Sequence, residues 1–483
     1  MSAARPLLTL PLAALLSCAG APSTSDAGPP DSGPPDSGSS QPPGFADGVA
    51  LFEAPDLDPA PGSLEVNLTA KVAAVKVNGL TVNRWTYDGH LPGPTLRATV
   101  GDRVLVHFKN ELPEATTIHW HGVKVPADMD GSEATQAPIP PGGTFDYRFT
   151  VTEAGLFWYH PHLDSSTQIG SGLYGAIEVV DPAELALGDP VVLVLSDEST
   201  TDAGVLLPGD ESGWFGDYFG REGNTLLVNG RVRPTLKARA GLPQRWKLLN
   251  ASRARFYQLK IPGAQVQRIG GDVGLLAAPQ PGNGVILTPG ERAELWVNPA
   301  APGTAASVQW LDSDRFHLGA KLPAQDLFVL ETVDAPALGG RPAPPAALRT
   351  IAPLDVADAG TRRLELMEKA QNGIGVLGIN GLTYDESKAT PIMVRLGDTE
   401  VWEVANTTGY DHSFHLHGYA FQPLDVAGQP WPVREWKDTV LVPAKQSLHL
   451  AVRFDDRPGM WMLHCHIIDH VTLGMMAMLH VMP

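Results

Sequence analysis

Four pairs of histidines, each with one residue between its members, are the part of this 483-residue sequence best suited to metal chemistry. The pairs are His119 and His121, His160 and His162, His415 and His417, and His464 and His466. A chain with 15 histidines is expected to contain only about half of one such pair by chance. Residues two apart on a strand project to the same face, so each pair presents two imidazoles side by side. Eight imidazoles without carboxylates or thiolates form a ligand set that suits three copper ions.

A second group of ligands surrounds the last pair. Cys465 lies between the two histidines of that pair and therefore points to the opposite face of its strand. There it can meet His470 and Met475 of the following segment, and His412 of a neighbouring strand. Two imidazoles, a thiolate and a weak thioether suit a blue-copper electron-transfer centre. Zinc also binds cysteine and histidine, but a methionine in the fourth position favours copper.

Three copies of one sequence pattern position these side chains. Each copy begins with an Asn-Gly dipeptide and contains a later Gly that is followed nine residues on by Asn. The dipeptides begin at Asn78, Asn229 and Asn380, and the later asparagines are Asn110, Asn250 and Asn406. Apolar residues alternate between these landmarks, which predicts strands packed on one face. The repeat therefore predicts three β-sandwiches of one type.

The repeat also predicts where the imidazole cluster forms. Histidine pairs occupy equivalent offsets in the first and third copies, whereas the second copy has Leu259 and Ile261 at one of those offsets. The cluster must therefore assemble at the interface of the first and third sandwiches. The peptide bonds that join Cys465 to its two histidine neighbours would connect the thiolate site directly to the cluster.

Composition and charge limit the classes of partner. Apolar residues make up 43% of the chain and charged residues 18%, with 50 glycines and 44 prolines, as is typical of globular proteins with many short strands and turns. The formal net charge of −18 disfavours binding to nucleic acid and to anionic lipid. We therefore expect no nucleic-acid partner.

The N-terminus predicts export. Arg5 precedes an apolar run, residues 7–16, which has the length of a signal peptide and is too short for a permanent membrane helix. Leu15-Leu16-Ser17-Cys18 resembles the bacterial lipoprotein signal, in which Cys18 would be acylated, while cleavage after Ala21 is the alternative. We expect a signal peptide over 1–18 and a disordered tether over 19–55. The protein would be a periplasmic or cell-envelope lipoprotein of a bacterium, and otherwise secreted.

Four segments of the sequence resemble the copper signatures of the three-domain multicopper oxidases. They are His119-Trp120-His121-Gly122, Trp158-Tyr159-His160-Pro161-His162, His412-Ser413-Phe414-His415-Leu416-His417-Gly418 and His464-Cys465-His466-Ile467-Ile468-Asp469-His470. The resemblance covers about residues 60–483. It implies an all-β fold of three consecutive cupredoxin-like Greek-key β-sandwich domains. Residues 56–182 and 346–483 would carry copper ligands, and residues 183–340 would carry none.

The resemblance also assigns the ligands of four copper ions. It places a type 1 copper at His412, Cys465, His470 and Met475, and a type 2 copper at His119 and His415. The type 3 pair would take His121, His160, His162, His417, His464 and His466. Asp130 matches a family position that supplies protons, but Val471 stands where cuprous oxidases of the family carry a second acid.

The implied reaction couples one-electron oxidation of a donor to four-electron reduction of O2 to water. Six of the ten methionines fall between Met460 and Met482, among ligands and core strands, so the Met-rich insert of cuprous oxidases is absent. We therefore expect laccase-like oxidation of phenols or aromatic amines at the edge of His470. The alternative is oxidation of Cu(I), Fe(II) or Mn(II) in metal homeostasis. Asp411, Asp438 and Asp469 are candidates for lining a cation path in that case, although a solvated or structural role is the favoured interpretation of each.

Two other functional classes fit the sequence less well. A copper-free binding protein of this fold would be expected to have lost ligands, yet all of the expected ligand positions are occupied. A copper nitrite reductase would have two repeats per chain and would lack the arrangement around Cys465.

Overall fold

The computed structural model describes residues 48–207, 213–299, 301–313, 315, 321–333, 343–371 and 374–483. These residues belong to one compact unit, Ser40–Pro483. The predicted signal peptide over 1–18 and most of the predicted tether lie outside the described residues. No helix within the described ranges is long and apolar enough to cross a membrane.

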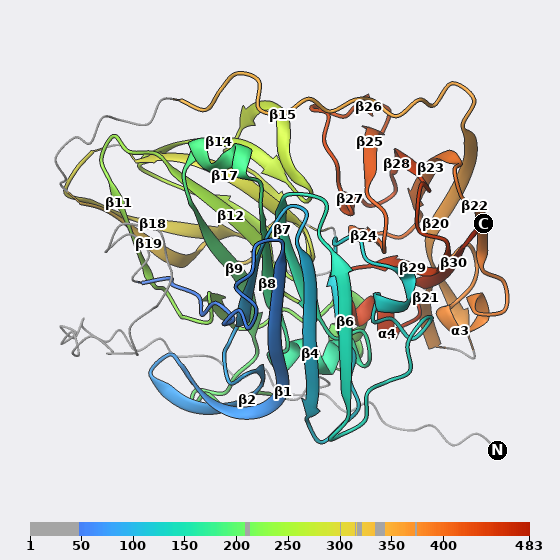
Figure 1. Ribbon diagram of the computed structural model, residues 1–483, viewed down its shortest axis with the longest axis horizontal. Helices are drawn as coiled ribbons and strands as arrows, with labels where there is room; N and C mark the ends of the chain where they lie inside the picture. Colours follow the sequence, from blue (N-terminus) through green and yellow to red (C-terminus); the bar gives the residue numbers. More distant parts are fainter. Residues whose placement is uncertain are drawn as a thin grey trace, which may run out of the picture. The chain divides into compact units, whose positions relative to one another are not determined.

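The described chain forms three successive pairs of β-sheets (Figure 1). In the first pair, one sheet has the order β2 (Leu80–Tyr87), β1 (Ser63–Val77), β4 (Arg103–Glu111), β6 (Thr144–Thr150). The other has the order β3 (Gly93–Thr99), β8 (Gly175–Val180), β7 (Gly155–His160), β5 (His119–His121). Val66, Phe108 and Tyr147 are among the fully buried side chains of the core of this pair.

The second pair has a six-stranded and a five-stranded sheet. The larger has the order β10 (Thr225–Val228), β9 (Pro190–Glu198), β12 (Gln244–Asn250), β17 (Arg292–Pro299), β14 (Ala264–Gly271), β15 (Gly274–Pro281). The smaller has the order β11 (Thr235–Arg239), β19 (Gln325–Val333), β18 (Thr304–Leu311), β13 (Tyr257–Lys260), β16 (Ile286–Leu287). Its core contains Trp246 and Trp310.

The third pair repeats this plan. One sheet has the order β21 (Ile374–Ile379), β20 (Gly360–Gln371), β23 (Thr399–Asn406), β28 (Ser447–Arg453), β25 (Phe421–Val426), β26 (Gln429–Pro430). The other has the order β22 (Ile392–Arg395), β30 (Met476–Met482), β29 (Gly459–Cys465), β24 (His412–Leu416), β27 (Thr439–Val442). Trp402, Phe414 and Trp461 fill its core.

Short helices lie between these strands. They are η1 (Ala127–Met129), α1 (Ser165–Gly170), η2 (Pro182–Leu187), α2 (Gly213–Phe219), α3 (Tyr384–Ser387) and α4 (Ile468–Thr472). In each pair of sheets the first long strand runs parallel to the strand that follows the repeat glycine: β1 pairs with β4, β9 with β12, and β20 with β23. The structure therefore confirms the predicted all-β fold and its threefold repeat.

The repeated residues have the same local role in all three sandwiches. Asn78, Asn229 and Asn380 have φ angles of 50°, 52° and 54°, and each is followed by a glycine with positive φ, as a two-residue hairpin turn of type I′ requires. Asn250, fully buried, donates its side-chain amide to the carbonyls of Arg255 and Leu287 and accepts from the amide of Ser252. Asn110 and Asn406 make the corresponding bonds in their own sandwiches.

The predicted C-terminal boundary of the disordered tether, residue 55, is wrong. Residues 48–55 are ordered: Val49 is only 2% exposed and belongs to the core of the middle sandwich. Asn229 donates to the carbonyl of Val49, and Phe52 stacks on His90 with ring centroids 3.9 Å apart. The burial of Val49, the hydrogen bond from Asn229 and the stacked rings offset the entropic cost of ordering the segment.

Asn250→Ala should lower the free energy of unfolding by at least about 2 kcal/mol, because two buried carbonyls and one amide lose their partner. Chemical denaturation followed by tryptophan fluorescence measures this change. Asn67→Ala, at an exposed position of β1, is the matched control and should have almost no effect. Equal stabilities of the two variants would show that Asn250 does not hold its sandwich together.

Candidate metal centres

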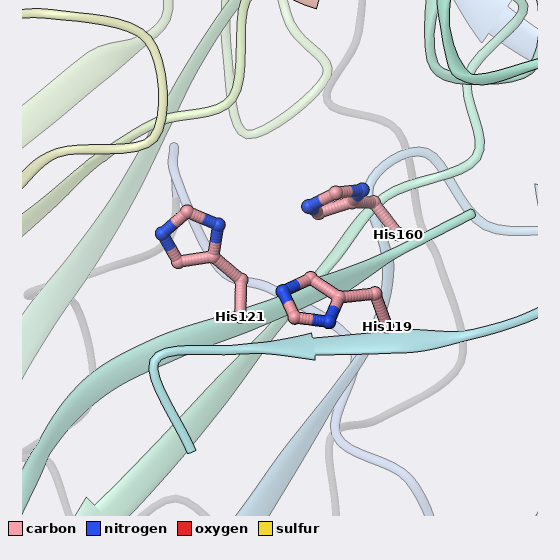
Figure 2. A group of neighbouring side chains, drawn as sticks. All are labelled: His119, His121 and His160. Atoms are coloured by element: carbon pink, nitrogen blue, oxygen red, sulfur yellow. The ribbon is translucent and has the colours of Figure 1, made fainter. Parts of the chain in front are cut away.

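Two strands from the first sandwich and two from the third bring the eight paired histidines together. His119 lies opposite His160 in the pairing of β5 with β7, and His415 lies opposite His464 in the pairing of β24 with β29. Figure 2 shows the rings of His119, His121 and His160 on one side of β5. All eight side chains are at most 7% exposed. The structure thus brings together, at one buried interface, every histidine that the sequence predicted for the cluster.

Donor atoms converge in three groups within this cluster. The ring nitrogens within each group lie within 4.8 Å of one another: His119, His121 and His160; His119, His415 and His417; and His162, His417 and His464. His466 joins the cluster through its ring, whose centroid is 4.8 Å from that of His121. Burial and neighbouring imidazoles hold the pKa values of His160, His464 and His466 well below the usual range. The rings are therefore neutral, as metal binding requires.

Hydrogen bonds leave one ring nitrogen of several histidines for a ligand. The Nδ1–H groups of His119, His160 and His415 donate to the backbone carbonyls of Asp130, Pro161 and Asp438 at 2.9–3.0 Å. Their Nε2 atoms are buried and have no hydrogen-bond partner within the described part of the chain. Buried polar atoms almost always have partners, so these orphaned nitrogens fit a bound metal ion.

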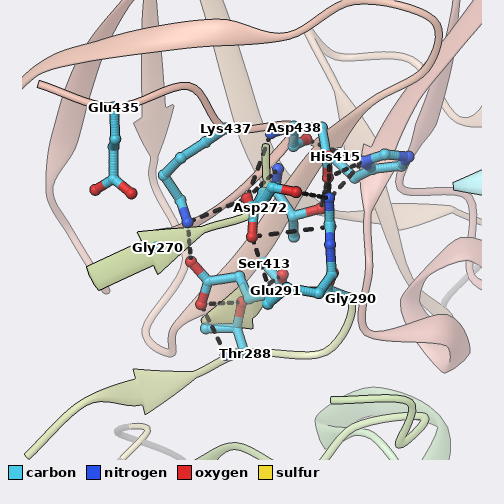
Figure 3. A network of polar contacts seen from close by, with 12 residues as sticks. Gly270, Asp272, Thr288, Gly290, Glu291, Ser413, His415, Glu435, Lys437 and Asp438 are labelled. Atoms are coloured by element: carbon cyan, nitrogen blue, oxygen red, sulfur yellow. Dashed lines mark hydrogen bonds and ion pairs between the residues drawn. The ribbon is translucent and has the colours of Figure 1, made fainter. Parts of the chain in front are cut away.

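His121 presents the opposite nitrogen. Its Nε2–H lies 3.0 Å from Oδ1 of Asp438, and its Nδ1 is buried with no partner among the described residues. Arg292 of β17 holds the same carboxylate, with Nη1 2.8 Å from Oδ1. Figure 3 shows Asp438 in one polar network with Lys437 and Asp272. Burial opposes ionisation of Asp438, but Arg292 and His121 outweigh it and hold the pKa of this carboxyl well below its usual range. The ionised carboxylate thereby fixes the tautomer of His121.

The middle sandwich thus takes part in the site although it carries none of the predicted ligands. Besides Arg292, it contributes Gly290, where a Cβ atom would lie 3.0 Å from the rings of His121 and His466. Lys437, next to Asp438, pairs with Asp272 and Glu291 of this sandwich at 3.1 and 3.0 Å. Sequence reasoning missed Arg292 because no spacing links it to the histidines. Asp438, in contrast, already stood out in the sequence as a candidate acid of a cation path.

Asp130 contacts two histidines of the cluster. Its Oδ2 is 2.9 Å from Nδ1 of His417, and its carbonyl accepts from His119. Burial raises the pKa of this carboxyl, but His417 and His119 outweigh that effect and hold the pKa well below its usual range. The structure therefore places Asp130 in contact with two of the predicted ligands.

A second centre forms on the other face of β29. Nδ1 of His412 and Nδ1 of His470 each lie 3.4 Å from Sγ of Cys465, and 3.2 Å from each other. All three side chains are fully buried. Burial raises the pKa of the Cys465 thiol to about 12, so a bound cation is needed to hold the thiolate. The donor set therefore fits a soft, redox-active metal ion.

Thr408 and Tyr218 orient the histidines of this second centre. The hydroxyl of Thr408 lies 2.8 Å from Nε2 of His412, and the carbonyl of Tyr218 in α2 accepts from Nε2 of His470 at 3.0 Å. Both rings therefore turn Nδ1 towards Cys465. Met475 is fully buried beside them, and its carbonyl accepts from the amide of Cys465 at 3.1 Å.

The three acids that are candidates for a cation path are not exposed. Asp411, Asp438 and Asp469 are 8%, 2% and 1% exposed. Asp469 is held by the hydroxyl of Ser166 and by Arg221, while Asp411 accepts from the amide of Ala444. These carboxylates hold neighbouring segments of the protein in place.

Comparison with known proteins decides the family. Two sequence profiles, each described as multicopper oxidase, match residues 69–184 and 355–483. The multicopper oxidase MmcO of Mycobacterium tuberculosis is 30% identical over 460 residues, which cover 86% of each chain. The chain belongs to the multicopper oxidase family.

Other members of the family are similar over most of their length. A multicopper oxidase of Campylobacter jejuni, described as a metallo-oxidase, has a TM-score of 0.81 and 28% identity over 90% of this chain and 94% of its own. A laccase of Bacillus stratosphericus is 27% identical and covers 81% of this chain and 89% of its own. This multicopper oxidase is therefore a copper-dependent oxidoreductase of cupredoxin-like fold, with four copper ions and O2 as electron acceptor.

Asp438→Asn should weaken copper binding in the histidine cluster about 10- to 100-fold, because an amide binds His121 and Arg292 less strongly than a carboxylate does. Copper analysis and the electron paramagnetic resonance signal of type 2 copper measure this loss. The blue absorption of type 1 copper should persist and would show that the fold is intact.

Asp425→Asn is the matched control for this change. It alters a similar Asp–His pair, with His449, on a more exposed strand remote from both centres. Full copper content in both variants would contradict a supporting role for Asp438.

Proposed function

We propose that this multicopper oxidase is laccase-like and takes single electrons from phenols or aromatic amines. The observation that carries this proposal is the position of Cys465, which shares one buried centre with His412 and His470 while its two chain neighbours belong to the histidine cluster. Bound copper would supply the one-electron chemistry at the first centre and the reduction of O2 at the second. The covalent chain between them is short and dry, as rapid electron transfer requires.

The proposed ligands are those that the family resemblance assigns. His412, Cys465, His470 and Met475 would hold type 1 copper, and His119 and His415 type 2 copper. His121, His160, His162, His417, His464 and His466 would hold the type 3 pair. The orphaned nitrogens of the cluster and the convergence of the donor atoms of His412, Cys465 and His470 support this assignment.

An aromatic surface beside the proposed type 1 copper site supports the choice of an organic electron donor. The donor does not reach the ring of His470 itself, because that ring is fully buried under the carbonyl of Tyr218. The half-buried ring of Tyr218 instead lies 5.6 Å from that of Tyr410, which is 5.7 Å from His470. The phenol of Tyr218 donates to the exposed carboxylate of Glu368. Aromatic donors can pack on such a ring and hydrogen-bond to such a carboxylate.

Oxidation of Cu(I), Fe(II) or Mn(II) remains the second candidate, since the similar enzyme of C. jejuni is described as a metallo-oxidase. The buried and partnered state of Asp411, Asp438 and Asp469 argues against a cation path along those acids. We further propose Asp130 as a carboxylate of the proton supply, on the basis of its contacts with His417 and His119.

Steady-state O2 consumption by the copper-loaded enzyme tests the donor. We expect a substituted phenol to support faster turnover than Fe(II), Mn(II) or Cu(I) at matched concentrations. Preference for one of the metal ions would establish a metallo-oxidase instead. Cys465→Ser is the control, because it removes the thiolate and should abolish both the blue absorption and turnover with every donor.

We propose export to the cell envelope, with Cys18 as the site of a lipid anchor. This proposal depends on the sequence of the first 18 residues alone. Cys18→Ala should move the enzyme from the membrane fraction to the soluble fraction, because a single residue would carry the acyl chains. An unchanged distribution between the fractions would rule out acylation of Cys18.

A further inference from the structure

A row of methionines follows the same sheet face as the copper histidines. On β29 the residues Met460 and Met462 precede His464 at intervals of two, so all three side chains share one face. On β30 the facing residues in register are His480, Met478 and Met476. Met393 of β22 lies beside His480 in turn. We name this row the methionine ladder: Met393, Met460, Met462, Met476, Met478 and His480.

The ladder runs from the protein surface to the histidine cluster. At the outer end, Met393 is 41% exposed, and Met460 and His480 are half-buried. Met462 and Met478, directly opposite each other, are 0% and 7% exposed.

The inner end of the ladder adjoins two predicted ligands. Met476 lies opposite His464, and the carbonyl of Met462 accepts from the amide of His417 at 3.0 Å. Met462, Met476 and Met478 pack together as one buried cluster, with Met460 against it. Adjacent strands lie about 4.8 Å apart, so neighbouring rungs can share one ion.

Core packing alone does not explain the choice of residue. The opposite face of the same two strands fills the core of the third sandwich with Trp461, Leu463, Leu479 and Val481. Flexible thioethers gather only on the face that also carries the histidines. The His480 ring has no hydrogen-bond partner within the described ranges, which leaves its nitrogens available to a ligand.

We propose that the methionine ladder binds Cu(I) at its exposed end and delivers it to the histidine cluster during copper loading. Thioethers and imidazoles are the ligands that select Cu(I) over harder cations. Met393, Met460 and His480 form the entry site, and Met462, Met478 and Met476 carry the ion inward to His464. The proposal depends on the copper content of the enzyme and not on its electron donor, so a metal-oxidising enzyme would leave it intact.

Silver binding tests the entry site. Ag(I) has the ligand preference of Cu(I) but is not oxidised by the enzyme. In equilibrium dialysis, the copper-loaded enzyme should bind one Ag(I) more than the double variant Met393→Leu and Met460→Leu, which retains side-chain size. Equal binding by the two proteins would overturn the proposed entry site.

The rate of copper loading tests the relay. Full-length protein freed of copper is mixed anaerobically with Cu(I) in acetonitrile, and samples are quenched with a Cu(I) chelator and exposed to air. The double variant Met462→Leu and Met478→Leu should gain the near-ultraviolet absorption of the type 3 pair about tenfold more slowly, since it lacks soft ligands along the path. Its blue absorption should develop at the wild-type rate, because the type 1 residues lie on the other face of β29.

Met367→Leu is the matched control for loading. Met367 lies on β20 in the other sheet of the same sandwich, where its sulfur accepts from the amide of Gly381. This variant should load both centres at the wild-type rate. Wild-type loading of the type 3 pair by the ladder variant, or equal slowing of both centres, would overturn the proposed relay.

Discussion

Eight imidazoles must face one another in a buried space between two sandwiches, and the rest of the structure depends on this constraint. Burial favours the uncharged form of rings such as His160, His464 and His466, but it also makes each unpaired ring nitrogen costly. Carbonyl and carboxylate acceptors therefore bind one nitrogen of several rings and leave the other to a metal ion. Bound copper ions would satisfy the remaining nitrogens. Metal binding and the packing of the two sandwiches are thus parts of one equilibrium.

The middle sandwich supplies part of the support for this interface. It has the same fold as its neighbours, but apolar residues replace the histidines, and Leu259, Ile261 and Trp310 lie in its core. Its contribution is made through Gly290, which permits close approach to two rings, and through Arg292, which holds Asp438. An arginine in a fully buried position is stable only because Asp438 and backbone carbonyls accept its hydrogen bonds.

The alternation of side chains along β29 links the two metal centres. Cys465 faces His412 and His470 in the second centre, while His464 and His466 face the cluster, and the main chain between them is the connection. The same alternation separates Met460 and Met462, on the cluster side, from the tryptophan and leucine of the core. One strand of seven residues, Gly459–Cys465, therefore serves the core, a candidate copper path and both metal centres.

Much of this arrangement is determined by sequence alone. The alternation of apolar and polar residues and the repeated asparagines specify three sandwiches. The alternation fits strands with one buried face, and each asparagine amide binds backbone carbonyls of its own sandwich. The offsets of the histidine pairs place the cluster between the first and third sandwiches, since the second copy has Leu259 and Ile261 instead. In these respects local spacing is sufficient, because the residues concerned lie on one strand or one turn.

Only the tertiary structure decided which residues orient the ligands and what covers them. Arg292 lies 146 residues from Asp438 in the chain, and Tyr218 lies 252 residues from His470. No periodicity connects such partners, because they meet only when separate sandwiches pack together. The ordered segment 48–55 has the same explanation. Its composition is typical of a linker, but Val49 packs into the core of the middle sandwich, which is formed by residues far from it in the sequence.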